Sequence, residues 1–171
     1  GENEADWSML ALQTVNRLYN GCTTKDILEA MMNVCLDQNE EVYFYIAGKI
    51  LISNIYKDLY PNSIPHSLRD QLESMGDQEI YLDFLDEYTD EEIEELEDVI
   101  DHSKDFLLTH SQINQMRNKY LCTNRVTKKL YETPQFMFMR VAMAVCMYEE
   151  NRVEKVKVLY RLLSDFNLNL P

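Results

Sequence analysis

Glycine is scarce in this chain of 171 residues, which contains four: Gly1, Gly21, Gly48 and Gly76. Glycine-rich phosphate loops need several glycines at fixed spacing, because only glycine lets the backbone come close to a phosphate. Neither a GxGxxG sequence nor a Walker-type loop is present. The sequence therefore excludes a βαβ nucleotide-binding fold.

Potential metal ligands are also few or badly spaced. The three histidines are scattered, and the four cysteines include no CxxC pair. Zinc sites and redox dithiols depend on close ligand spacing. Carboxylates are abundant over residues 77–105, but they lack the aspartate order and central glycine of an EF-hand loop. We therefore predict no metal site, and we expect the cysteines to be buried free thiols.

Positive charge is in short supply, since 16 Lys and Arg face 30 Asp and Glu for a net charge of −14. Nucleic acid is not an expected ligand, because its phosphates are repelled. Much of the excess lies in residues 77–105, interpreted as a solvated helix face with its loops. No apolar run approaches the roughly 20 residues that span a bilayer, and the first residues are acidic, unlike a signal peptide. We expect a cytoplasmic location and no membrane contact.

Apolar residues recur at helical spacing almost throughout, which predicts an all-α fold. A first helix is expected over residues 6–19 with Asp6 as N-cap, and Thr23 with Asp26 forms a capping box that opens a second. Asn39 is expected to cap a third, long helix that runs to Lys57. Residues 60–65 contain two prolines and predict a subdomain boundary.

The second half predicts further helices and one small β-hairpin near residues 120–132. The expected helical segments are residues 65–75, a short piece at 82–85, a helix opened by the capping box of Thr89 and Glu92, residues 111–119, 134–148 and, capped by Asn151, 151–166. Residues 134–148 are apolar nearly all round, so this helix is expected to be buried. Its methionines and aromatics are interpreted as core.

Three segments resemble the large subunit of class I ribonucleotide reductases. Residues 119–127 (KYLCTNRVT) and 131–136 (YETPQF) are similar to the family's KYL..NRVT..IYE..Q pattern. Residues 82–92 (LDFLDEYTDEE) and 100–105 (IDHSKD) resemble its YT.EE and IDH.RD stretches, and residues 164–171 (SDFNLNLP) resemble the F....LP that leads into the first barrel strand. Their order and spacing match, and the resemblance covers essentially the whole chain.

The first sixty residues resemble the carboxy-terminal part of the family's ATP cone, a module that senses ATP or dATP. Residues 19–27 (YNGCTTKDI) and 45–49 (YIAGK) carry this likeness. The resemblance places Thr24 and Lys57 on nucleotide-contacting positions, although by themselves they are a helix cap and a helix-dipole partner. Leu28 and Ser53 stand where the family has histidine and phenylalanine, and the cone's β-cap has no counterpart. The implied domains are cone-like helices over residues 1–60 and a helical domain over residues 61–171.

The resemblance implies an amino-terminal regulatory and structural segment of a ribonucleoside-diphosphate reductase, an oxidoreductase that makes deoxyribonucleotides for DNA synthesis. No catalytic residue carries over, because the chain is expected to end about where the catalytic barrel starts. Implied partners are that barrel, a small subunit with a metal-generated radical, and ATP or dATP as effectors, with no cofactor in this segment. Whether the chain is a fragment or one polypeptide of a split enzyme stays open.

Two competing functions rest on the charge alone. One is a stand-alone acidic helical module that binds a basic protein partner. The other is an acidic mimic of DNA, which requires residues 77–105 to form an ordered, outward-facing surface. Three basic residues at the predicted hairpin tip are interpreted as solvated surface: Arg125, Lys128 and Lys129.

Overall fold

The computed structural model describes residues 4–78, 80–81, 83–124 and 126–168. Three helices occupy one end: α1 (Trp7–Val15), α2 (Thr24–Asp37) and α3 (Glu41–Leu59). The other elements are η1 (Pro61–Ser63), α4 (Leu68–Asp77), α5 (Phe84–Glu87), α6 (Asp90–Glu97), η2 (His102–Leu107), α7 (His110–Lys119), α8 (Pro134–Cys146) and α9 (Arg152–Ser164). The predicted all-α class is confirmed. No helix in the described ranges is long and apolar enough to cross a membrane.

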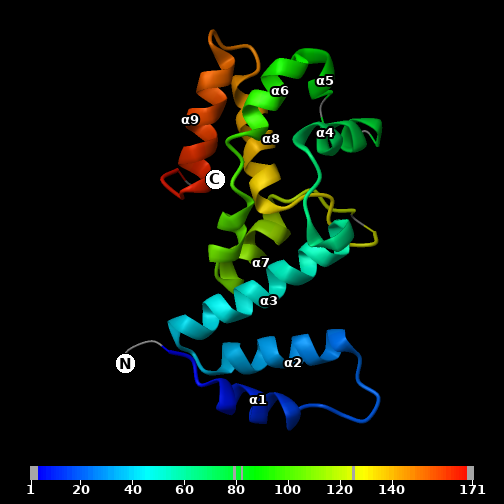
Figure 1. Ribbon diagram of the computed structural model, residues 1–171, viewed down its shortest axis with the longest axis vertical. Helices are drawn as coiled ribbons and strands as arrows, with labels where there is room; N and C mark the ends of the chain where they lie inside the picture. The colour runs from blue at the N-terminus through cyan, green and yellow to red at the C-terminus, as the bar shows by residue number, and fades with distance from the viewer. Residues whose placement is uncertain (1–3, 79, 82, 125, 169–171) are drawn as a thin grey trace.

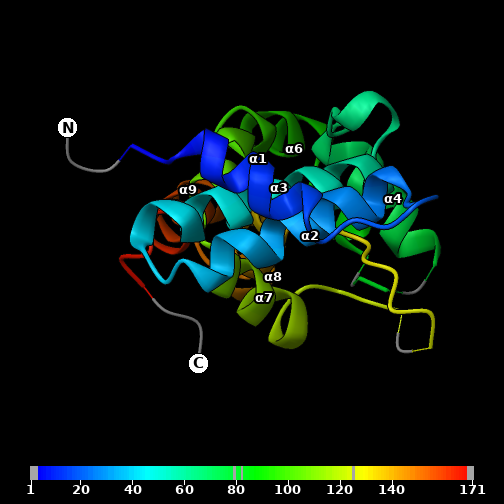
Figure 2. The ribbon, with the colours of Figure 1, turned by 90° about the horizontal axis from the view of Figure 1, so that it is seen from below.

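The molecule is a stack along its long axis (Figure 1). Helices α1 and α2 lie side by side at one end, and α3 crosses the stack obliquely above them (Figures 1 and 2). Beyond α3 come α7 and then α8 and α9, with α4 to α6 beside them. Helix α3 therefore contacts both parts of the molecule.

Local sequence signals explain the start of the N-terminal helices. The Asp6 carboxylate accepts a hydrogen bond from the Met9 amide at 2.9 Å, which confirms the predicted N-cap. Thr23 and Asp26 form the predicted capping box. The prediction for Asn39 was wrong: it has a left-handed backbone (φ 54°), and Glu40 takes the N-cap position without a side-chain bond. Asn39 instead reverses the chain between α2 and α3.

Helix α3 separates two hydrophobic cores. A small one lies between α1, α2 and the first half of α3 and consists of Leu10, Val34, Cys35, Tyr43 and Ala47. A much larger one fills the space between α3 and the remaining helices. Where α3 meets the η2–α7 connection, a Cβ on Gly48 would lie 2.1 Å from the Leu108 carbonyl oxygen. The missing side chain therefore lets two backbones pack directly.

Helix α8 forms the centre of the large core. All residues from Pro134 to Met139 are buried, as predicted. The second half departs from the prediction, because Ala144 and Val145 are exposed and the helix ends at Cys146, leaving Tyr148 exposed as well. An apolar composition marked this helix as buried, but its last turn reaches the surface.

Other predicted boundaries shift when the local geometry is seen. Helix α1 ends at Val15, and α4 starts at Leu68, capped by Ser67, and continues through Gly76. Asn151 does not cap α9, since its backbone is left-handed and it makes no cap bond. The predicted hairpin is reduced to one antiparallel bridge, Thr123 to Leu130. Arg125, Leu82 and the last three residues, which carry parts of the motifs above, lie outside the described residues.

Candidate functional site

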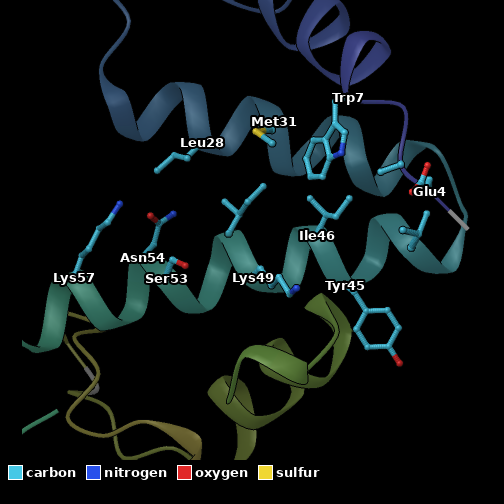
Figure 3. Close-up of a pocket in the computed structure, with 13 residues that line it drawn as sticks. Glu4, Trp7, Leu28, Met31, Tyr45, Ile46, Lys49, Ser53, Asn54 and Lys57 are labelled. Atoms are coloured by element: carbon cyan, nitrogen blue, oxygen red, sulfur yellow. The ribbon is translucent and has the colours of Figure 1, made fainter. Parts of the chain in front are cut away.

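A groove of about 840 Å³ runs between α3 on one side and α1 and α2 on the other (Figure 3). Its middle is apolar, with Leu28 and Met31 on α2 facing Ile46 and Ile50 on α3. Trp7 extends from α1 into one end of the groove. The groove therefore offers an apolar slot that is open to solvent.

Polar groups gather at the other end of this groove. Ser53, Asn54 and Lys57 all line it from the second half of α3, and in Figure 3 Asn54 and Lys57 reach toward α2. Residues three and four apart lie on one helix face, which explains why these three share a wall. Lys57 is exposed and makes no ion pair with a described residue. Its ammonium is therefore available to an anion.

The two predicted nucleotide residues have different places. Lys57 lines the groove together with Leu28 and Ser53, the two positions that depart from the family pattern. Thr24 is exposed at the first position of α2, one helical turn before Leu28, and is not part of the groove wall. The fold thus brings Lys57, Leu28 and Ser53 together and leaves Thr24 beyond the end of the groove.

The start of α2 is occupied by its own carboxylate. Asp26 accepts hydrogen bonds from the Thr23 amide at 2.7 Å, the Thr23 hydroxyl at 2.8 Å and the Tyr19 hydroxyl at 3.2 Å. The bond from the Thr23 amide, followed by that from its hydroxyl, lowers the pKa of Asp26. This ionised carboxylate takes the position that a helix N-terminus offers to anions. An anion in the groove must therefore rely mainly on the lysines of α3, Lys49 and Lys57.

Two groove residues had escaped the sequence prediction. Asn54 lines the polar end of the groove, and its place three residues before Lys57 is the signal that could have found it. Trp7 lies on the predicted first helix and is 60% exposed. Nothing in the sequence marks Trp7 as a groove residue, because its exposure depends on how α1 packs.

No cluster of three or more His, Cys, Asp or Glu side chains suited to a metal ion occurs within the described ranges. The four cysteines are free thiols; Cys35 and Cys146 are buried, whereas Cys22 and Cys122 are partly exposed. Burial raises the pKa of the Cys122 thiol to about 11. The Cys122 thiol is therefore protonated near neutral pH and is a poor nucleophile or metal ligand.

The sequence matches known proteins along its full length. Residues 106–171 match the family model described as the ribonucleotide reductase all-alpha domain. The chain is 30% identical to ribonucleoside-diphosphate reductase 1 subunit alpha of Escherichia coli K12 and to the subunit alpha of Haemophilus influenzae, in each case over 100% of this chain and 23% of the relative. It is 32% identical to the subunit alpha of enterobacteria phage T4, over 90% of this chain and 21% of that relative.

The chain thus spans under a quarter of the length of these relatives. The all-alpha domain model covers the part of the chain that contains α7, α8 and α9, and helices α1 to α6 precede it. On these matches the chain corresponds to the amino-terminal region of ribonucleoside-diphosphate reductase large subunits.

Proposed function

We propose that this chain is the regulatory and structural amino-terminal region of an enzyme that reduces ribonucleoside diphosphates to deoxyribonucleotides. Residues 1–60 form the part that responds to ATP or dATP, and residues 61–171 form the helical domain that joins it to the catalytic barrel. The observation that carries this proposal is the alignment of reductase large subunits with the whole chain, groove helices included. Catalysis belongs to the remainder of the large subunit together with a radical-bearing small subunit.

The groove suits the two halves of a nucleotide. The apolar slot between Leu28, Met31 and Ile46 accepts a base, and the trailing phosphates reach Lys57, with Thr24 just beyond. An ammonium and a hydroxyl are ordinary phosphate partners. Ser53 offers no ring for stacking, so the apolar walls and Trp7 supply the contact area.

Helix α3 supports the proposed coupling between the groove and the helical domain because it contacts both. Lys57 lines the groove, whereas the adjacent Tyr56 is buried and donates a hydrogen bond to Asp105 of η2 at 2.8 Å. One turn later, the Tyr60 hydroxyl donates to Thr133, the N-cap of α8, at 3.5 Å. A nucleotide that shifts or stiffens α3 therefore acts on the start of α8.

The outer surface of α8 and α9 suits contact with the rest of the large subunit. Val145, Val158 and Leu162 line one shallow apolar groove and are 64%, 54% and 39% exposed. Phe166 and Leu168 line another apolar groove, beside α7. Apolar patches of this kind mark interaction surfaces, and the greater part of each relative's length lies outside the aligned region.

The acidic stretch 77–105 gives less support to a DNA mimic. Arg152 of α9 donates to Glu92 through Nε at 2.8 Å and Nη2 at 2.6 Å, and Lys157 pairs with Glu95. Asp105 is fully buried. Three acidic side chains of this stretch therefore bond within the fold and hold α6 and η2 in place.

Calorimetric titration with ATP and dATP tests the nucleotide proposal. We expect saturable binding that weakens at least about tenfold in Lys57→Gln, because a charge-assisted contact is lost, and less in Thr24→Ala. Lys119→Gln is the matched control, since Lys119 is also an exposed, unpaired lysine but lies outside the groove. Binding that is absent, or that is equally strong in Lys57→Gln, contradicts the proposal. Unchanged circular dichroism shows that the variants fold.

A further inference from the structure

A second groove, of about 310 Å³, lies on a neighbouring face of α3 and is closed by α2, α7 and the turn before Leu130. Asn54 lines both grooves; the other lining residues differ. The apolar floor of the second groove comprises Met32, Leu51, Ile55, Leu59 and Leu130. The charged side chains that line it are Lys25, Arg117, Lys128 and Lys129 and, with opposite sign, Glu29 and Asp58. A chain with a net charge of −14 thus gathers four cations from three separate elements in one place.

None of these four cations is used to hold the fold together. Seven other lysines and arginines form ion pairs within 4 Å, but no described carboxylate pairs with these four. The carboxylates of Glu29 and Asp58 are likewise outside ion-pair distance of them. The local excess of positive charge is therefore left for an external anion.

Ordinary surface effects do not account for the whole set. Arg117 is in the last turn of α7, where the helix dipole favours a cation. Lys25 is in the first turn of α2, where the same dipole disfavours one. Helix stability therefore explains Arg117 but not the approach of Lys25 to the same groove.

The two remaining lysines, Lys128 and Lys129, follow residues that are hydrogen-bonded to Asn124. The Asn124 side-chain oxygen accepts hydrogen bonds from the Val126 amide at 2.9 Å and the Thr127 amide at 2.8 Å. The Lys128 amide donates to the Asn124 carbonyl at 2.9 Å, and Lys128 has a left-handed backbone (φ 60°). Such a conformation is unfavourable for a non-glycine residue. These hydrogen bonds place both lysines beside the groove that they line.

The geometry points to a second anion site: this groove binds a small ligand that has an apolar body and carries at least two phosphate charges. The guanidinium of Arg117 offers a planar fork for phosphate oxygens, and the lysines act as point charges around it. The apolar floor receives the body of the ligand, and the volume is at the lower end for small-molecule pockets. This site is separate from the proposed nucleotide groove and does not depend on it.

The test is calorimetric titration at low ionic strength with two probes, pyrophosphate and ADP. We expect saturable binding of both, with ADP the tighter because it alone fills the apolar floor. Arg117→Gln and the double variant Lys128→Gln/Lys129→Gln should each weaken pyrophosphate binding by about tenfold. Leu130→Ala should remove most of the advantage of ADP over pyrophosphate.

The matched controls are Arg161→Gln and Lys119→Gln, because both residues are exposed, unpaired cations outside this groove. Equal losses in the controls would show general charge attraction and overturn the site. If pyrophosphate binding weakened in Lys57→Gln and stayed unchanged in Arg117→Gln, the anion would be assigned to the groove that Lys57 lines instead. Equal affinity for pyrophosphate and ADP would overturn the apolar part of the proposal.

Discussion

The two sides of α3 are built differently. On the α1–α2 side a core of five buried residues is bordered by exposed apolar side chains, with Trp7, Leu12, Val15 and Tyr19 each at least 60% exposed. On the other side, a far larger core encloses buried polar groups that bond to one another. Exposed apolar surface is thus found beside the small core, whereas hydrogen-bonded buried polar side chains are found in the large core.

The clearest example of fixed geometry is Glu132, whose side chain is fully buried. Arg140 donates to it twice, through Nε at 3.0 Å and Nη2 at 2.8 Å, and the Cys122 amide donates at 2.8 Å. The Tyr81 hydroxyl also bonds to it, and the Arg140 guanidinium lies over the Tyr81 ring at 5.2 Å. This cluster ties the hairpin turn and α8 to the α4–α5 connection, and the α1–α2 side has no comparable cluster among its described residues.

The largest effect is expected from Arg140→Met. The change preserves much of the apolar stem but leaves the Glu132 carboxylate buried without its cation. Breaking a buried pair from one side costs about 3–5 kcal/mol. Urea unfolding followed by circular dichroism should show this loss of stability.

Lys155→Met is the control, because Lys155 pairs at 2.6 Å with Glu149 on the surface, where both side chains are about half exposed. Exposed pairs contribute less than about 1 kcal/mol. Similar losses in the two variants would show that the buried cluster is no more important than a surface pair.

Matched leucine deletions should separate the two cores. Leu10 and Leu96 are both buried, at 1% and 0% exposed, but belong to the small and the large core respectively. A buried Leu→Ala change costs about 2–5 kcal/mol. We expect Leu96→Ala to lower global stability, and Leu10→Ala to speed amide hydrogen exchange in α1 and α2 while leaving α8 protected. Faster exchange of α8 in Leu10→Ala would show that the cores unfold as one unit.

Sequence reasoning worked where structure is set by neighbouring residues. The capping boxes at Thr23 and Thr89 and the N-cap at Asp6 formed as predicted. It failed at Asn39 and Asn151, because asparagine is suited both to an N-cap and to a left-handed turn. Which of the two is adopted depends on how the chain must reverse between packed helices, and this is a tertiary property.

The same division applies to the candidate sites. Helical spacing alone puts Ser53, Asn54 and Lys57 on one face, so the polar end of the first groove was within reach of the sequence. The second groove was not, because Lys25, Arg117 and Lys128 come from elements whose packing no local pattern encodes. The sequence showed only a basic tip at the predicted hairpin.

Gly48→Ala tests the contact between α3 and the larger part of the molecule. Alanine is normally the better helix former by about 1 kcal/mol. Here its Cβ would meet the Leu108 carbonyl oxygen at 2.1 Å, so backbones must move apart, and overpacking of this kind costs about 1–3 kcal/mol. We expect a small net loss in thermal unfolding. Gly76→Ala is the control, since nothing lies within 4 Å of its Cβ position and it should stabilise α4.

In the unmodified chain the smallest net effect is expected for the pH dependence of stability, because two buried groups near the end of α3 act in opposite directions. Burial raises the pKa of Asp105 from 3.8 to about 7, and burial lowers the pKa of His102 from 6.5 to about 4. Between pH 3.8 and about pH 7 the unfolded chain has released the Asp105 proton while the folded chain keeps it. This group therefore makes stability fall as pH rises. The unfolded chain also binds a proton on His102 that the folded chain refuses, so that group makes stability rise with pH.

The two contributions oppose each other between about pH 4 and pH 6.5, each with a slope near 1.4 kcal/mol per pH unit. Removing one should therefore reveal the other. Relative to the unmodified chain, Asp105→Asn should gain stability as pH rises through this window, and His102→Gln should lose it. Urea unfolding at several pH values measures both differences, and the other carboxylates cancel because all three proteins share them. Parallel curves for all three would mean that neither group is held in its neutral form, and that the protein around α8 is more hydrated than its packing indicates.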